Sequence, residues 1–112
     1  MLKFTKSGSF NSLFDSKGVA QDYAETVKWY RLAAAQGVAN AQNNLGRMYN
    51  NGEGVTQDYI RAHMWLNLSA ASGDASNLKN RDIIARKMTS QQITQAQIMA
   101  RDCQHKKFKG CN

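Results

Sequence analysis

The sequence has no long hydrophobic run. None of the apolar stretches in its 112 residues approaches the ~20 residues that a membrane-spanning helix needs. The N-terminal residues 1–6 carry charge, with no apolar stretch behind them, so we expect no signal peptide. The length predicts one small domain with a modest core and no membrane span.

Histidine is also scarce, which limits the chemistry available. Neither His63 nor His105 has a second histidine, a cysteine or a carboxylate at a convincing metal-ligand spacing. Cys103 and His105 are two residues apart, and side chains at that spacing on a helix diverge, so they are not a nucleophile pair. We therefore expect no metal, no cofactor, no catalytic residue and no enzymatic activity.

The chain has only two cysteines, Cys103 and Cys111, eight residues apart near its end. Gly110 breaks the helix there and lets the tail fold back, which favours an internal disulfide. Two reduced thiols, or an intermolecular bridge, stay open as alternatives. A disulfide indicates a periplasmic or secreted protein, and free thiols indicate a cytoplasmic one.

Acidic residues are too few to balance the basic ones, and the net charge is +7. Residues 18–78 hold four basic and five acidic side chains, whereas residues 79–112 hold eight basic and two acidic. The basic end is either a solubilising terminus or a patch for an acidic partner, anionic lipid or nucleic acid. Residues 106–109 (KKFK) contain a single aromatic, too little for a nucleic-acid motif, so we do not expect a nucleic-acid partner.

An internal repeat is the strongest pattern present. Residues 18–23 (GVAQDY) return as residues 54–59 (GVTQDY), 36 positions further on. Over residues 18–39, 11 of 22 positions equal the residue 36 further along. Self-similarity at this period is typical of stacked helical repeats, which present surfaces to partners.

Helix signals agree with the repeat. Asp22 and Asp58 are expected N-caps, and Thr89 with Gln92 resembles a capping box. Apolar spacing and turn residues predict an all-α fold, a short α/α solenoid of about five antiparallel helices. The expected helices cover residues 23–36, 39–50, 59–72, 75–88 and a stretch that begins at Thr89.

Residues 39–74 carry a specific motif, AxAQxxLGxMYxxGxGVxxDY, followed by Trp65 and a pair of alanines before Gly73. This motif resembles the Sel-one-like repeat, an α/α solenoid family related to tetratricopeptide repeats. The resemblance divides the chain into a half repeat (18–38), a full repeat (39–74) and C-terminal capping helices with a tail (75–112). Residues 1–17 depart from the pattern and are expected to be degenerate or irregular.

Five residues are assigned structural roles. Gly46 is expected to let two helices approach closely, and Gly52 and Gly54 to shape the turn within a repeat. Trp29 and Trp65 occupy equivalent places and are each expected to anchor one layer, with a surface position as the alternative.

The resemblance implies a protein-interaction module, bacterial in origin, that binds a protein or peptide. In this family the first helix of each repeat tends to line the concave surface. The candidate partner-binding residues are therefore the polar ones of helix 39–50, namely Asn40, Asn43, Asn44 and Arg47. A basic margin on the next inner helix is expected from Lys79, Arg86 and Lys87.

Three alternatives remain. Cysteine-rich relatives of this family are associated with β-lactam binding or hydrolysis, although they carry cysteine pairs through successive repeats. The basic C-terminus offers nucleic-acid or anionic-partner binding. The degenerate N-terminal end leaves an apolar face that, by hypothesis, drives homo-oligomer formation.

Overall fold

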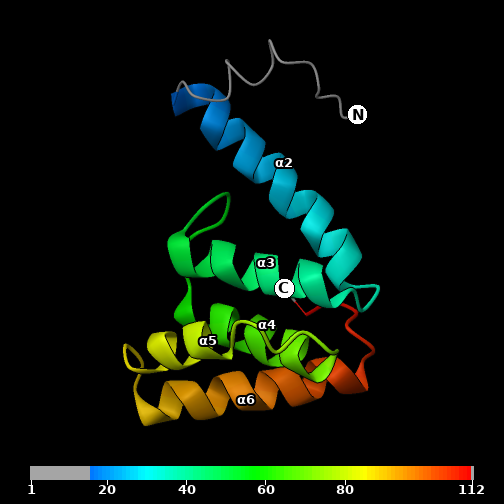
Figure 1. The fold of residues 1–112 in the computed structure, drawn as a ribbon, viewed down its shortest axis with the longest axis vertical. Helices are drawn as coiled ribbons and strands as arrows, with labels where there is room; N and C mark the ends of the chain where they lie inside the picture. The colour runs from blue at the N-terminus through cyan, green and yellow to red at the C-terminus, as the bar shows by residue number, and fades with distance from the viewer. Residues whose placement is uncertain (1–15, 112) are drawn as a thin grey trace.

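The computed structural model describes residues 16–111, and their side chains from Asp22 onward. Within this range the chain forms helices and no strand, and the helices stack against one another (Figure 1). The prediction of an all-α helical repeat is confirmed. The helices are α2 (Ser16–Ala34), α3 (Ala39–Asn51), α4 (Tyr59–Ala71), α5 (Leu78–Ala85) and α6 (Ser90–His105).

The helix boundaries follow local capping signals at α4 and α6. The side chain of Asp58 accepts a hydrogen bond from the Arg61 backbone N–H at 3.0 Å. Thr89 and Gln92 form the expected capping box, with reciprocal bonds of 3.1 and 2.9 Å. The expected cap at Asp22 is wrong, because α2 begins at Ser16 and Asp22 lies inside it.

The segment that we expected to be a half repeat, residues 18–38, differs in structure from residues 39–74. α2 runs across the expected repeat start at residue 18, where the second repeat has its turn. Of the segment 1–17 that we expected to be irregular, residues 1–15 lie outside the described residues. None of the described helices combines the length and the apolar character needed to cross a membrane.

α4 is the centre of the fold. It packs against α3, α5 and α6, while α2 packs against α3. Trp65, Met64 and Leu68 of α4 are among the most deeply buried side chains, with 1–2% of their surface exposed. Leu45 of α3 and Ile84 of α5 belong to the same core cluster. Because α4 is buried on several sides, it joins the apolar contributions of the neighbouring helices into one core.

Three glycines permit the close packing around α3. A Cβ at Gly46 would lie 3.0 Å from Leu66 Cγ and 3.1 Å from the Ala62 carbonyl oxygen, so α3 and α4 meet almost backbone to backbone. Gly52 ends α3 with a left-handed φ of +70°. Gly54 has φ +75°, and a Cβ there would overlap the backbone of Tyr23 in α2.

The two repeat-equivalent tryptophans lie in different environments. Trp65 is 2% exposed, but Trp29 is 58% exposed, so the prediction that Trp29 anchors a layer is wrong. Trp29 Nε1 donates to Glu25 Oε2 at 3.2 Å, and Lys28 Nζ lies 5.8 Å from the ring centroid. Leu32 beside it is 54% exposed. The difference arises because α4 is packed by helices on several sides, whereas this side of α2 has no such cover among the described helices.

The C-terminal tail is closed by the predicted disulfide. Cys103 and Cys111 are joined, with their Cα atoms 5.6 Å apart. α6 ends in a Schellman motif, in which the Phe108 N–H bonds the Cys103 carbonyl and the Lys107 N–H bonds the Gln104 carbonyl. Lys107 and Phe108 both have positive φ, which is costly for residues other than glycine.

Phe108 connects this tail to the other end of the repeat body. Its ring packs against the core cluster and lies in the space beside Gly37, where a Cβ would come within 3.2 Å of Phe108 Cε2. Gly37 is in the turn between α2 and α3, and Figure 1 shows the end of the chain returning to that turn. The disulfide therefore holds a segment that bridges distant parts of the stack.

We expect Trp65→Ala to lower the free energy of unfolding by about 3–5 kcal/mol, because it empties a packed core site. Trp29→Ala is the matched control and should change stability by less than about 1 kcal/mol, because its ring is largely solvated. Equilibrium denaturation of the two variants measures this difference. Equal losses would contradict the assigned positions of the two rings.

Removing the disulfide with a Cys103→Ser/Cys111→Ser double variant should lower the free energy of unfolding by about 2–3 kcal/mol. The bridge closes a short loop in the unfolded chain and holds two residues of positive φ in the folded one. Chemical denaturation of the wild type with and without a reductant should reproduce the same loss. Unchanged stability in both experiments would refute a clamping role for the bridge.

Candidate binding surface

A polar row runs along one side of α3. Asn40, Asn44, Arg47 and Asn51 follow one another at spacings of four, three and four residues, which places them on a single helix face. Asn40, Arg47 and Asn51 are exposed, and Asn44 is half-buried. Asn44 Nδ2 donates to Asn40 Oδ1 at 3.4 Å, so the two amides lie side by side. We call these four residues the α3 stripe.

Asn43 does not belong to this face, which corrects its assignment as a binding residue. It is 4% exposed, and its Nδ2 donates to Asp74 Oδ2 at 3.1 Å. Ser69 completes the cluster by donating to the carbonyl oxygens of Ala39 and Asp74. Asn43 therefore ties the start of α3 to the connection between α4 and α5.

The same cluster sets the titration of Asp74. The Ser76 hydroxyl and backbone N–H both donate to its carboxylate, and Asn43 adds a third donor. These bonds favour the charged form and lower the pKa of Asp74.

The α3 stripe leads into a hollow between α3 and α5. The hollow has a volume of about 220 Å³. Its polar rim is Arg47, Asn50, Asn51, Asn80 and Lys87, and its apolar floor is Leu66, Ile83 and Ile84. We call it the α3–α5 hollow.

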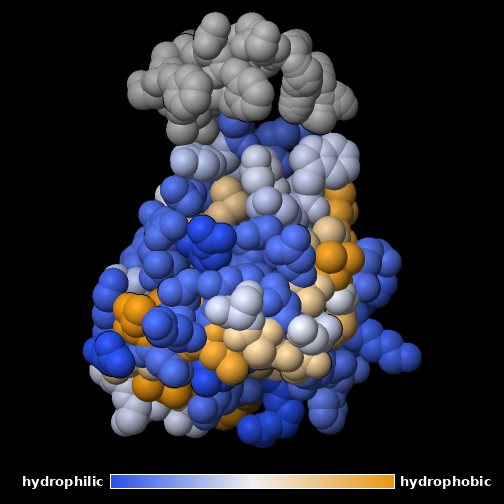
Figure 2. Space-filling model, in the orientation of Figure 1, coloured by the Kyte–Doolittle hydropathy of each residue, from blue (hydrophilic) through white to orange (hydrophobic). Residues whose placement is uncertain are grey.

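Only one of the three residues that we expected to form a basic margin lines the α3–α5 hollow. Lys87 lines it, but Lys79 and Arg86 lie outside. The apolar side chain of Ile83 is 40% exposed here. Figure 2 shows mainly hydrophilic groups over α3, with apolar groups nearer α5 and α6.

The α3–α5 hollow carries a local positive charge. Among the described residues, no carboxylate pairs with Arg47 or Lys87; Lys87 Nζ lies 5.6 Å from the Tyr59 ring centroid. Neither nearby carboxylate forms an ion pair with these cations: Glu53 accepts from Asn51 Nδ2 at the rim, and Asp82 pairs with Arg81. Two cations therefore border an apolar floor without a direct ion pair among the described residues.

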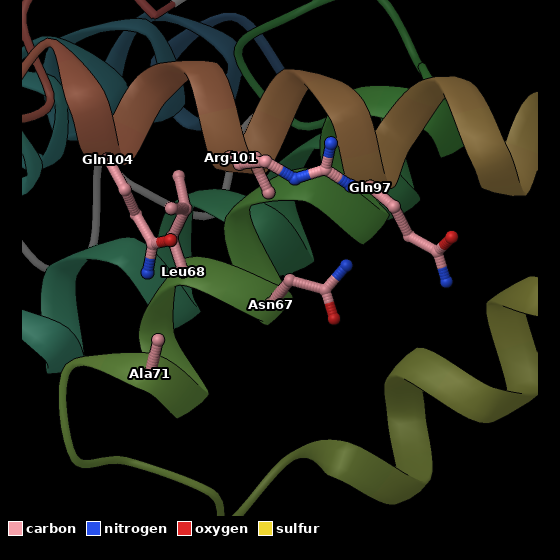
Figure 3. A pocket seen from close by; sticks show the side chains of 7 residues that line it. Asn67, Leu68, Ala71, Gln97, Arg101 and Gln104 are labelled. Atoms are coloured by element: carbon pink, nitrogen blue, oxygen red, sulfur yellow. The ribbon is translucent and has the colours of Figure 1, made fainter.

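A second hollow of about 290 Å³ lies between α4 and α6. Figure 3 shows Gln97, Arg101 and Gln104 of α6 opposite Asn67, Leu68 and Ala71 of α4. Its rim holds amides and one guanidinium. No pattern in the sequence indicates this hollow, because its walls come from helices that only tertiary packing brings together.

His63 is buried in α4 and is held by a short hydrogen-bonded chain. Arg81 Nη1 donates to Asn67 Oδ1 at 2.8 Å, which turns Asn67 Nδ2 toward His63 Nδ1 at 3.0 Å. His63 Nδ1 is therefore an acceptor. Burial, and secondarily the Arg81 charge, lower the pKa of His63. In the described part of the chain, no group of three or more histidine, cysteine or acidic side chains is placed to hold a metal ion.

Asn50, Asn51 and Asn80 belong to this surface but were not among the partner-binding residues expected from the sequence. Asn51 continues the helical spacing of Asn40, Asn44 and Arg47, so that spacing was the available signal. Asn50 and Asn80 reach the hollow only because α3 and α5 lie close together in the fold.

Comparison with known families gives one match. The family model described as the Sel1 repeat matches residues 9–38 and 39–74, more than half of the chain. No curated protein and no solved structure matches.

Because the pKa of His63 lies below its ordinary value of 6.5, the folded chain takes up this proton less readily than the unfolded chain. The stabilisation is fully present above pH 6.5 and is lost as the pH falls below it. We expect the free energy of unfolding to decrease between pH 7.5 and 5.5 in the wild type. His63→Gln should flatten this dependence, and His105→Gln, at an exposed position, should keep it.

Denaturation at the two pH values measures this effect. An NMR titration of the wild type gives an independent reading, in which the pKa of His63 should lie below its ordinary value of 6.5. The same pH dependence in His63→Gln as in the wild type, together with an ordinary titration of His63, would overturn the assignment.

Proposed function

Because this chain belongs to the Sel1 repeat family, we propose that it is a protein-interaction module that binds an extended segment of a partner along the α3 stripe. Sel1 repeats are generally protein-interaction modules. The observation that carries the proposal is the row of amides and one guanidinium on an exposed helix face that opens into the α3–α5 hollow.

The chemistry of the α3 stripe suits a polypeptide backbone. Each asparagine amide has two N–H donors and an oxygen with two lone pairs, so the capacity left beside its bonds within the chain can bind the C=O and the N–H of an extended segment. The eleven residue steps from Asn40 to Asn51 span about 16 Å of helix. A strand rises about 3.3 Å per residue, so the stripe matches about five residues of an extended segment.

An enzymatic role, including β-lactam binding or hydrolysis, has less support. The two hollows measure about 220 and 290 Å³. Small-molecule sites typically measure about 300–1,000 Å³. The polar groups around both hollows are amides and cations, with no nucleophile paired to a base. A scaffold that binds without catalysis fits this chemistry better.

The Cys103–Cys111 disulfide supports a proposal about the cellular compartment in which the chain works. Bridges of this kind persist in oxidising surroundings such as the periplasm and the extracellular space. We therefore infer that the module works in such a compartment, where Cys103–Cys111 stays closed.

The test is affinity capture from native-host extract, with partners identified by mass spectrometry. An Asn44→Ala/Arg47→Ala variant should lose the partners that the wild type retains. Gln97→Ala/Arg101→Ala, a matched amide and arginine pair at the α4–α6 hollow, should retain them. Capture of the same partners by both variants would contradict the proposed surface.

A photo-crosslinker placed at Asn44 gives a second readout that does not depend on affinity. It should form adducts with the captured partner, whereas the same group at Gln97 should not. Thermal melts of all variants verify that folding is unchanged, since these side chains are partly or fully exposed.

A further inference from the structure

The α3–α5 hollow is specialised beyond general backbone binding. Two cations, Arg47 and Lys87, stand on its rim without a carboxylate partner among the described residues, and Leu66, Ile83 and Ile84 form its floor. We propose that this hollow selects an internal acidic side chain, Asp or Glu, next to an apolar side chain in the bound segment. The inference rests on the proposed function, because it specifies which segment the α3 stripe holds.

The asparagine amides at the rim of the hollow already form hydrogen bonds within the chain. Asn50 Nδ2 donates to Asn51 Oδ1 at 3.0 Å, and Asn51 Nδ2 donates to Glu53 Oε1 at 3.3 Å. Asn80 Nδ2 donates to Asn77 Oδ1 at 2.6 Å. One N–H of each amide is therefore used within the chain, and Asn50 Oδ1 is a buried acceptor without a hydrogen-bond partner among the described residues. The strongest unused donors at the rim belong to Arg47 and Lys87, and a carboxylate is their natural acceptor.

The apolar floor of the hollow favours a peptide over a nucleic acid as the anionic partner. A peptide carboxylate can be followed directly by an apolar side chain, which would cover the exposed part of Ile83. A nucleic-acid backbone has no such group, and the residues that line the hollow include no aromatic ring on which a base could stack. The volume of about 220 Å³ suits one or two side chains.

The position of Arg47 in the α3 stripe favours an internal residue over a chain end. Asn40 and Asn44 precede Arg47 along the helix, and Asn51 follows it. A segment that bonds all three asparagines must therefore continue past the cationic site in both directions. A free C-terminal carboxylate at Arg47 would leave one end of the stripe empty.

Selection from a random peptide library displayed on phage, with the full oxidised chain as bait, tests this directly. Enriched peptides should carry Asp or Glu beside Ile, Leu or Val. Synthetic copies, acetylated and amidated, should bind at least tenfold more weakly when the acid is changed to its amide. Arg47→Gln and Lys87→Gln should each weaken binding similarly, whereas Lys79→Gln, on α5 but outside the hollow, should not.

The outcomes separate the two claims. Enriched peptides without an acidic residue, or equal binding by wild type, Arg47→Gln and Lys87→Gln, would overturn the acidic selection and leave the proposed function standing. Tighter binding of copies that end at the acid, with a free carboxylate, would overturn the internal position. A library from which nothing is enriched would count against the proposed function itself.

Discussion

The close approach of α3 and α4 at Gly46 is the constraint on which the rest of the structure depends. A side chain at this position would meet Leu66 and the backbone of Ala62, so a larger residue requires Leu66 or the backbone of α4 to shift. α4 is also the helix against which α5 and α6 pack. Moving α3 away from α4 would therefore shift the α3 stripe relative to α5 and open the α3–α5 hollow. The binding surface is a consequence of helix packing in the core.

Local sequence signals predicted the parts of the fold that depend on a few neighbouring residues. Asp58 and the Thr89–Gln92 pair cap their helices because the partners lie three residues apart. The repeat failed as a guide at Trp29, which shares its sequence context with Trp65 but not its neighbours in space. A repeat predicts burial only where a further layer covers the same side of the helix.

The binding surface was likewise predictable only where it depends on residue spacing within a single helix. Helical spacing alone selects Asn40, Asn44 and Arg47 and excludes Asn43, which the amide-rich composition had brought into the set. The contribution of α5 could not be derived in this way, because its approach to α3 depends on how α4 orients both helices. The distribution of charge along the sequence did not indicate the hollow either. Most basic residues lie after residue 78, but of the two cations at the hollow only Lys87 comes from that region, and Arg47 comes from α3.

The central claim is that partners bind at α3 and α5, and NMR mapping of the backbone and asparagine side-chain amides tests it most directly. On addition of a bound peptide, the account predicts that the largest shift changes fall on Asn40, Asn44, Arg47 and Asn51 and on the α5 face around Ile83. Changes concentrated at the α4–α6 hollow, or on the exposed side of α2, would contradict it.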